Sequence, residues 1–189
     1  GRDEQKTKKV ARALGVSGYT DPGKLINSPD VDAIDVCYPT QIHCQYVTAA
    51  LMQGKHVFCE TPIAYTLAEA ERMSQTATSC GKLLLVALFA RFVSDYKYVH
   101  DYIAAGRLGN PRVVFANRRT PPIWGSGWDK NFIPNLMLHD IDYVYWLLGK
   151  PLAMTSRALG NPKKGWEHVF IALEYEDSCA IIEGCGIMP

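Results

Sequence analysis

The chain has 189 residues, 48% of them hydrophobic and 21% charged, which is ordinary for a soluble globular protein. A formal net charge of +1 gives no basic field for nucleic acid, and no apolar run resembles a membrane span or a signal peptide. We therefore expect a cytoplasmic protein with neither a nucleic-acid nor a membrane partner.

The first half of the sequence alternates predicted helices and strands. A helix is expected from Asp3 to about Leu14, ended by Gly15. Thr66 and Glu69 have the spacing of a capping box, which predicts the start of a helix that runs to about Ser79. The other expected elements are strand 33–38, helix 43–52, strand 56–59 and strand 82–91.

This alternation predicts parallel βαβ units with right-handed crossovers. The nearly continuous apolar strands fit a sheet covered on both faces. In such sheets ligands gather outside the carboxyl ends of the strands. Three polar strand ends would then share one edge, Tyr38-Pro39-Thr40, Glu60-Thr61-Pro62 and Ala90-Arg91, although polar residues also begin most ordinary loops.

The second half predicts strands that follow one another without intervening helices. A helix from Ser94 to Ala105 precedes strand 112–119, and a helix from Asn135 to Leu148 precedes strands 152–159, 168–175 and 178–188. We expect an α/β fold with a partial Rossmann-type parallel sheet over residues 1–92. An α+β domain with an open antiparallel or mixed sheet follows over residues 93–189.

An irregular segment lies between Thr120 and Asn131. Its tryptophans Trp124 and Trp128 could cover a ligand as a lid, or they could serve only to pack the loop.

Six cysteines occur without any CxxC pair, whereas a structural zinc site would need close pairs. Buried, reduced thiols are the expected state. They are Cys37, Cys44, Cys59, Cys80, Cys179 and Cys185.

The predicted helix from Asn135 carries a second polar group. Asn135 and His139 lie four residues apart and would share a face, with Asp142 three residues further on. His139 could act as an acid, a base or a hydrogen-bond donor, with its ring held by the Asp142 carboxylate. A locally satisfied histidine beside the core is the alternative. A metal site including Asp140 is disfavoured, because adjacent helical residues point to different faces, so we predict no metal.

Taken in order, these segments resemble the Gfo/Idh/MocA (glucose–fructose oxidoreductase/inositol dehydrogenase) family. The resemblance is carried by VDAIDVCYPTQIH, ALMQGKHVFCETPIAYTLAEAERM, LLLVALFARF, GRLGNPRVV and NLMLHDIDYVYWLLG. It runs from near Asp3 to near Ala158. It implies a dinucleotide-binding domain for NAD or NADP, then a domain whose open sheet often forms a homo-oligomer contact.

The resemblance also assigns residues. Cofactor contacts are implied for Pro39, Thr40, His43, Glu60, Pro62 and Arg91, with a bond before Pro62 that is commonly cis. The catalytic positions fall on Thr61, Asn135 and His139, of which His139 is implied to recognise a substrate hydroxyl or transfer its proton.

Three departures from the family pattern matter. Thr61 replaces a lysine that the family uses for proton transfer, and Asn135 replaces an aspartate, so His139 is left as the only obvious acid–base group. No GxGxxG occurs, and that fingerprint would precede Asp3. We therefore expect a fragment lacking the first βαβ unit and the C-terminal end. We expect such a fragment to bind NAD poorly and to be inactive by itself.

Two functional hypotheses follow. The parent protein is expected to be an NAD(P)-dependent oxidoreductase acting on a sugar, a polyol or a related hydroxyl or ketone compound. The alternative is a binding or regulatory homologue that has lost its chemistry. An enzyme resembling biliverdin reductase ranks lower, because that branch lacks the motif lysine but keeps no matching histidine pattern.

Overall fold

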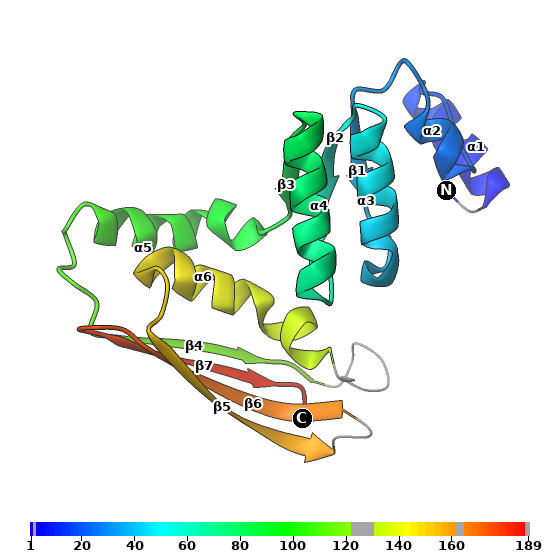
Figure 1. Cartoon of the computed structure of the whole chain (residues 1–189). Helices are drawn as coiled ribbons and strands as arrows, with labels where there is room; N and C mark the ends of the chain where they lie inside the picture. Colours follow the sequence, from blue (N-terminus) through cyan, green and yellow to red (C-terminus); the bar gives the residue numbers. More distant parts are fainter. Residues whose placement is uncertain (2, 122–130, 162–164, 188–189) are drawn as a thin grey trace. The chain divides into compact units, whose positions relative to one another are not determined.

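The computed structural model describes residues 1, 3–121, 131–161 and 165–187, and it divides into two compact units. They comprise Gly1–Ala87 and Leu88–Pro189, and each is described by itself (Figure 1). The sequence placed the domain boundary at 92/93, whereas the two units divide between Ala87 and Leu88, and Phe89–Phe92 packs on helices of the second unit.

The first unit is built on a parallel sheet with strand order β1-β2-β3. Val36 pairs with Cys59, and Cys59 pairs with Val86, so the three strands end at one edge. The predicted parallel βαβ arrangement is confirmed. The elements are α1 (Glu4–Leu14), α2 (Pro22–Ile26), β1 (Ala33–Val36), η1 (Thr40–Ile42), α3 (His43–Met52), β2 (His56–Cys59), α4 (Leu67–Cys80) and β3 (Leu84–Val86).

Local capping explains where the helices of this unit begin and end. The Thr66 hydroxyl accepts a hydrogen bond from the backbone N–H of Glu69 and donates one to its carboxylate, which confirms the predicted helix start with Thr66 as the N-cap. Gly81 ends α4 in the left-handed conformation, where glycine pays no Cβ penalty. The short α2, capped by the Asp21 side chain, was not predicted.

Two sequence predictions about this sheet are wrong. The third strand was expected to reach Arg91, but β3 ends at Val86 and a 3₁₀ turn, η2 (Phe89–Phe92), follows. Both faces of the sheet were expected to be covered. In the described part of the chain α3 and α4 cover one face, and Phe58 and Leu85 on the other face are 37% and 54% exposed.

The core of the first unit lies between that covered face and the two helices. Val57 and Cys59 of β2 meet Val47 and Leu51 of α3 and Met73 of α4 there, and all five side chains are almost completely buried. The apolar spacing in α3 and α4 therefore orients both helices by burial.

The second unit is a mixed four-stranded sheet in the order β4-β7-β6-β5, which confirms the predicted mixed sheet. The β4–β7 pair is parallel, and the other two pairs are antiparallel. The elements are η2, α5 (Ser94–Ala104), β4 (Val113–Arg119), a π-helical turn η3 (Ile133–Met137), α6 (Leu138–Leu148), β5 (Ala153–Asn161), β6 (Gly165–Glu174) and β7 (Cys179–Cys185).

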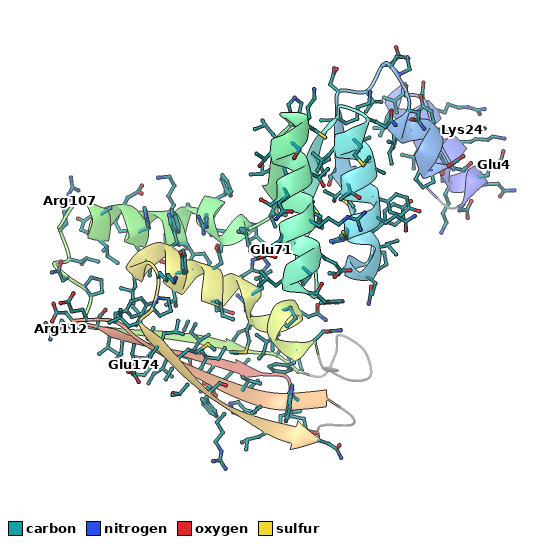
Figure 2. All side chains as sticks on the ribbon, viewed as in Figure 1. Glu4, Lys24, Glu71, Arg107, Arg112 and Glu174 are labelled. Atoms are coloured by element: carbon teal, nitrogen blue, oxygen red, sulfur yellow. The ribbon has the colours of Figure 1, made fainter. Side chains whose placement is uncertain are left out.

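Helix α6 packs on β4 and β7, and α5 packs on α6, as Figure 1 shows. Side chains fill the space between α6 and the sheet (Figure 2). The π-helical turn lies close to β7 at Gly184, where an added Cβ would stand 2.6 Å from Met137 Cγ and 3.1 Å from Phe132 Cε1. Glycine at 184 therefore permits the close approach of this turn to the sheet.

The proposed tryptophan lid, Trp124 and Trp128, lies outside the described residues. Among the residues that are described, none of the helices is both long and apolar enough to span a bilayer.

All six cysteines are free thiols. Cys44, Cys59 and Cys185 are buried as predicted, but Cys37 is exposed because it lies just beyond the end of β1.

Candidate functional site

The carboxyl ends of β1 and β2 form a polar rim in the first unit. The chain leaves β1 through Tyr38 and Pro39 into η1, which begins at Thr40, and it leaves β2 at Glu60. The backbone N–H of Glu60 donates to the carbonyl of Val36 over 3.1 Å, so the two strand ends remain paired. Two of the three predicted strand ends therefore lie at one edge of the sheet.

His43 fastens the two loops of this rim. Its Nε2 lies 2.6 Å from the Tyr38 carbonyl oxygen, and its Nδ1 lies 3.0 Å from that of Pro62. Cys59 Sγ is a further 3.4 Å neighbour of Nδ1, and the His43 residue is only 1% exposed. The buried His43 ring thus links the loop after β1 to the loop after β2. Its predicted contact with a cofactor stays a prediction.

Glu60, Thr61 and Pro62 form the part of the rim that follows β2. The Glu60 carboxylate accepts a hydrogen bond from the backbone N–H of Thr61 over 3.3 Å. The Thr61–Pro62 peptide bond is cis, as the family resemblance implied. A glutamate and a threonine therefore follow one another directly after β2.

The thiols at the rim are held in their neutral form. Desolvation is the main cause that raises the pKa of Cys37 to about 11, with the Asp35 and Glu60 carboxylates adding to it. Burial, again with these two carboxylates, raises the pKa of Cys59 to about 12. Both thiols are therefore protonated and poor nucleophiles near neutral pH.

The second group of candidate residues lies on η3 and α6 in the second unit. Asn135 falls in the π-helical turn, and His139 falls in the first turn of α6. The prediction of one continuous α-helix is therefore wrong at its start. Because π-helical hydrogen bonds span five residues, the spacing of four does not place these two side chains as it would in an α-helix.

Two arginine–carboxylate pairs hold the first turns of α6. Arg91 donates to both oxygens of Asp142, over 2.9 and 2.6 Å, and Arg118 of β4 donates to both oxygens of Asp140. The hydrogen bonds raise the pKa of each guanidinium, against the opposing effect of burial. Such forked pairs fix geometry as well as charge.

His139 itself lies against Phe89 of η2, with ring centroids 4.1 Å apart and an interplanar angle of 54°. The contact was not predicted, and neither was the Arg118–Asp140 pair. Both join residues far apart in sequence, so no local pattern signals them.

Arg91 was predicted to lie on the rim of the first unit, but it belongs to the second unit and its guanidinium holds Asp142. Its predicted cofactor contact stays a prediction, as does a contact between Asp142 and the ring of His139.

The rim offers the Glu60 carboxylate and the threonines Thr40 and Thr61 at the carboxyl ends of parallel strands, which is where ligands bind in sheets of this kind. The sequence contains no GxGxxG for the pyrophosphate. Within the described residues, no group of three or more His, Cys, Asp or Glu side chains is arranged to hold a metal ion.

Residues 1–88 match the family described as "Oxidoreductase family, NAD-binding Rossmann fold" (Gfo/Idh/MocA). Myo-inositol 2-dehydrogenase of Thermotoga maritima is 30% identical over 151 residues, which cover 78% of this chain and 45% of that protein. Inositol 2-dehydrogenase of Pseudomonas savastanoi pv. phaseolicola is 31% identical over 166 residues, covering 82% and 49%. The chain spans about half the length of these relatives.

Solved structures agree on the fold. An NAD binding oxidoreductase from Klebsiella pneumoniae superposes with a TM-score of 0.88 at 22% identity, over 99% of this chain and 56% of that one.

Proposed function

The chain belongs to the Gfo/Idh/MocA oxidoreductase family, and from that premise we propose that the whole protein is an NAD(P)-dependent oxidoreductase acting on a polyol, a sugar or a related hydroxyl or ketone compound. The observation that carries the proposal is the rim of the first unit. It places Glu60, Thr61 and the cis Pro62 at the carboxyl ends of parallel strands. The distant relationship to two inositol dehydrogenases supports a polyol as substrate.

In this proposal Pro39, Thr40, Glu60 and Pro62 line the nicotinamide side of the cofactor, and His43 keeps their loops together. The cofactor, when bound, supplies the hydride acceptor or donor. Glu60 can accept hydrogen bonds from ribose hydroxyls, since an ionised carboxylate is acceptor-only. NAD and NADP are both compatible with these residues.

The proton is assigned to His139. During oxidation of a secondary alcohol the hydride leaves the carbon, and the hydroxyl proton passes to the imidazole; reduction reverses both transfers. Thr61 and Asn135 can donate or accept hydrogen bonds to the substrate, but neither side chain exchanges a proton readily near neutral pH. Substrate orientation is therefore their proposed role.

The test uses the whole gene product with NAD or NADP and a panel of inositols, sugars and their ketones. Turnover is expected with at least one polyol, and His139→Asn should lower kcat/KM by about 10²–10⁴-fold, the usual contribution of a general acid–base group. Silence across the panel with both cofactors would refute the enzymatic proposal.

A binding or regulatory homologue is the second candidate, favoured by Thr61 and Asn135 in place of ionisable residues. The variant Thr61→Lys/Asn135→Asp distinguishes the two. Activity that appears only in this variant supports the second candidate, whereas turnover by the wild type refutes it.

We also propose a homo-oligomer formed through the face of the four-stranded sheet turned away from α6. Strand register places Phe115, Leu159 and Phe170 on that face, and they are 66%, 47% and 38% exposed. The same face carries Arg157 and Glu174, so a two-fold arrangement can oppose unlike charges. Light scattering should show a dimer that Phe115→Glu dissociates. We further propose that the protein is cytoplasmic.

A further inference from the structure

We infer that Arg91 is a positioning residue for His139, acting through Asp142 and through the 3₁₀ turn η2 that carries both Arg91 and Phe89. The inference rests on the proposed function, in which His139 handles the substrate proton. It assigns to Arg91 a role within the second unit, in place of a direct contact with a cofactor.

The turn η2 follows one face of α6. His139, Asp142 and Trp146 lie at spacings of three and four residues, so they share a helix face. Phe89 lies on the His139 ring, and Arg91 holds Asp142 with two hydrogen bonds. Two residues of one short turn, Phe89 and Arg91, therefore contact two residues of α6 that lie one helical turn apart, His139 and Asp142.

Trp146 extends the same row of contacts. The Arg91 guanidinium lies over the Trp146 ring, 5.8 Å from the ring centroid. The imidazole of His100 from α5 stacks on the same tryptophan, with 3.8 Å between the ring centroids. Arg91 therefore touches both a carboxylate and an aromatic ring of α6. A planar guanidinium can make both contacts at once, whereas a lysine ammonium cannot reproduce the forked geometry.

The Arg91–Asp142 ion pair is partly buried, so neither charge is well solvated without its partner. The side chain of Asp142 is 10% exposed and that of Arg91 is 35% exposed. Removing one partner would leave the other charge poorly solvated, so the turn and the helix would have to move to rehydrate it. Because Phe89 is two residues from Arg91, such a movement changes the surface against which the His139 ring rests.

A second ion pair, Arg118–Asp140, holds α6 in place while η2 moves. Arg118 holds Asp140 to strand β4, on the opposite side of α6 from η2. The first helical turn is thus tied to the sheet through Asp140, while the His139 ring packs against Phe89 of η2. Loss of Arg91 should therefore loosen the ring without unfolding the helix.

The decisive experiment is NMR on the isotope-labelled 189-residue chain. The wild type should show an NOE between the rings of Phe89 and His139, and Arg91→Lys should lose it while retaining the far-UV circular dichroism of the wild type. Arg107→Lys is the matched control. Arg107 lies just beyond α5, over the ring of Tyr102, and is labelled in Figure 2. The NOE should survive in that variant.

Asp142→Asn is the second variant, because it keeps the shape of the side chain and removes the ion pair. The same loss of the NOE is expected. Persistence of the NOE in either variant would overturn the inference. Unfolding of both variants would overturn it too, since Arg91 would then serve the fold as a whole.

In the whole protein, Arg91→Lys should lower kcat by roughly 10–100-fold, the scale of a misplaced catalytic group, with a smaller change in substrate KM. A rise confined to the KM for NAD(P) would favour the cofactor contact and refute positioning. If no substrate turns over, the proposed function fails, while the NOE still decides whether Arg91 orients the His139 ring.

Discussion

Replacement of His43 by leucine should destabilise the first unit, because it removes the side chain that joins the two loops of the rim. Leucine fills a similar volume but has no hydrogen-bond donor. Its neighbours would include the carbonyls of Tyr38 and Pro62, which in the wild type lie 2.6 and 3.0 Å from the ring nitrogens.

The magnitude follows from those two contacts, of which a ring with a single N–H makes only one as a donated hydrogen bond, since both partners are carbonyl acceptors. A net hydrogen bond contributes about 0.5–1.5 kcal/mol, and a buried acceptor left without a partner costs about 1–3 kcal/mol. Since His43 is 1% exposed, we expect the free energy of unfolding of the first unit to fall by about 2–4 kcal/mol. This is a large share of the typical stability of a domain, about 5–15 kcal/mol.

The assay exploits the distribution of tryptophan. All four tryptophans lie after residue 120, so fluorescence excited selectively at tryptophan reports the second unit. Urea titration followed by far-UV circular dichroism, together with hydrogen exchange of peptides from residues 33–66, reports the first unit. The fluorescence midpoint should stay unchanged while exchange around Tyr38 and Pro62 accelerates.

His56→Leu is the control within the same unit. His56 Nδ1 accepts a single hydrogen bond, from the backbone N–H of Leu83, in an exposed setting. Its loss should cost about 1 kcal/mol or less. A His43→Leu variant no less stable than His56→Leu, with unchanged exchange at the rim, would refute the supporting role argued for His43.

Three further predictions concern single sites. Gly184→Ala should destabilise the second unit by about 1–3 kcal/mol, measured by urea titration of tryptophan fluorescence, because the new methyl group meets the methionine of the π-helical turn. Hydrogen bonds from Arg119, and then from His168, lower the pKa of Glu183. The carboxylate therefore stabilises the fold above about pH 4.5, and this stabilisation is lost as the pH falls through the lowered pKa. The variant Glu183→Gln should lose less stability in acid than the wild type, and an unchanged acid titration would contradict the assignment. With its pKa at about 11 against a usual 9.0, Cys37 should react with a disulfide reagent at pH 8 roughly 10-fold more slowly than an unperturbed thiol, despite its exposure, because the smaller thiolate fraction outweighs the higher nucleophilicity of that thiolate.

The sequence predicted most of the first unit because its signals are local. The capping box at Thr66, the glycines after α1 and α4, and the apolar strand at 56–59 each act within a few residues, and the structure has these elements where they were expected. The cis bond at Pro62 came from the family resemblance, since no local pattern distinguishes it.

The errors occur where distant residues decide the outcome. Apolar character continues past Val86, so the sequence extended β3 through a segment that instead packs on α5 and α6. The π-helical turn depends on its close approach to Gly184, nearly fifty residues later in the chain. Exposed Cys37 was assigned to the interior because its neighbours in β1 are apolar.

The position of β7 in its sheet has a consequence for synthesis. Of the four strands of this sheet β7 is the last in chain order, yet it stands between β4 and β6, and β4 has its sheet pairing in the described structure only with β7. The nascent polypeptide must therefore hold an unsatisfied β4 edge while α6 and the β5–β6 hairpin emerge. Contacts so distant along the chain form slowly and leave an interval open to aggregation. Translation pauses or chaperones acting in that interval would govern the yield of folded protein.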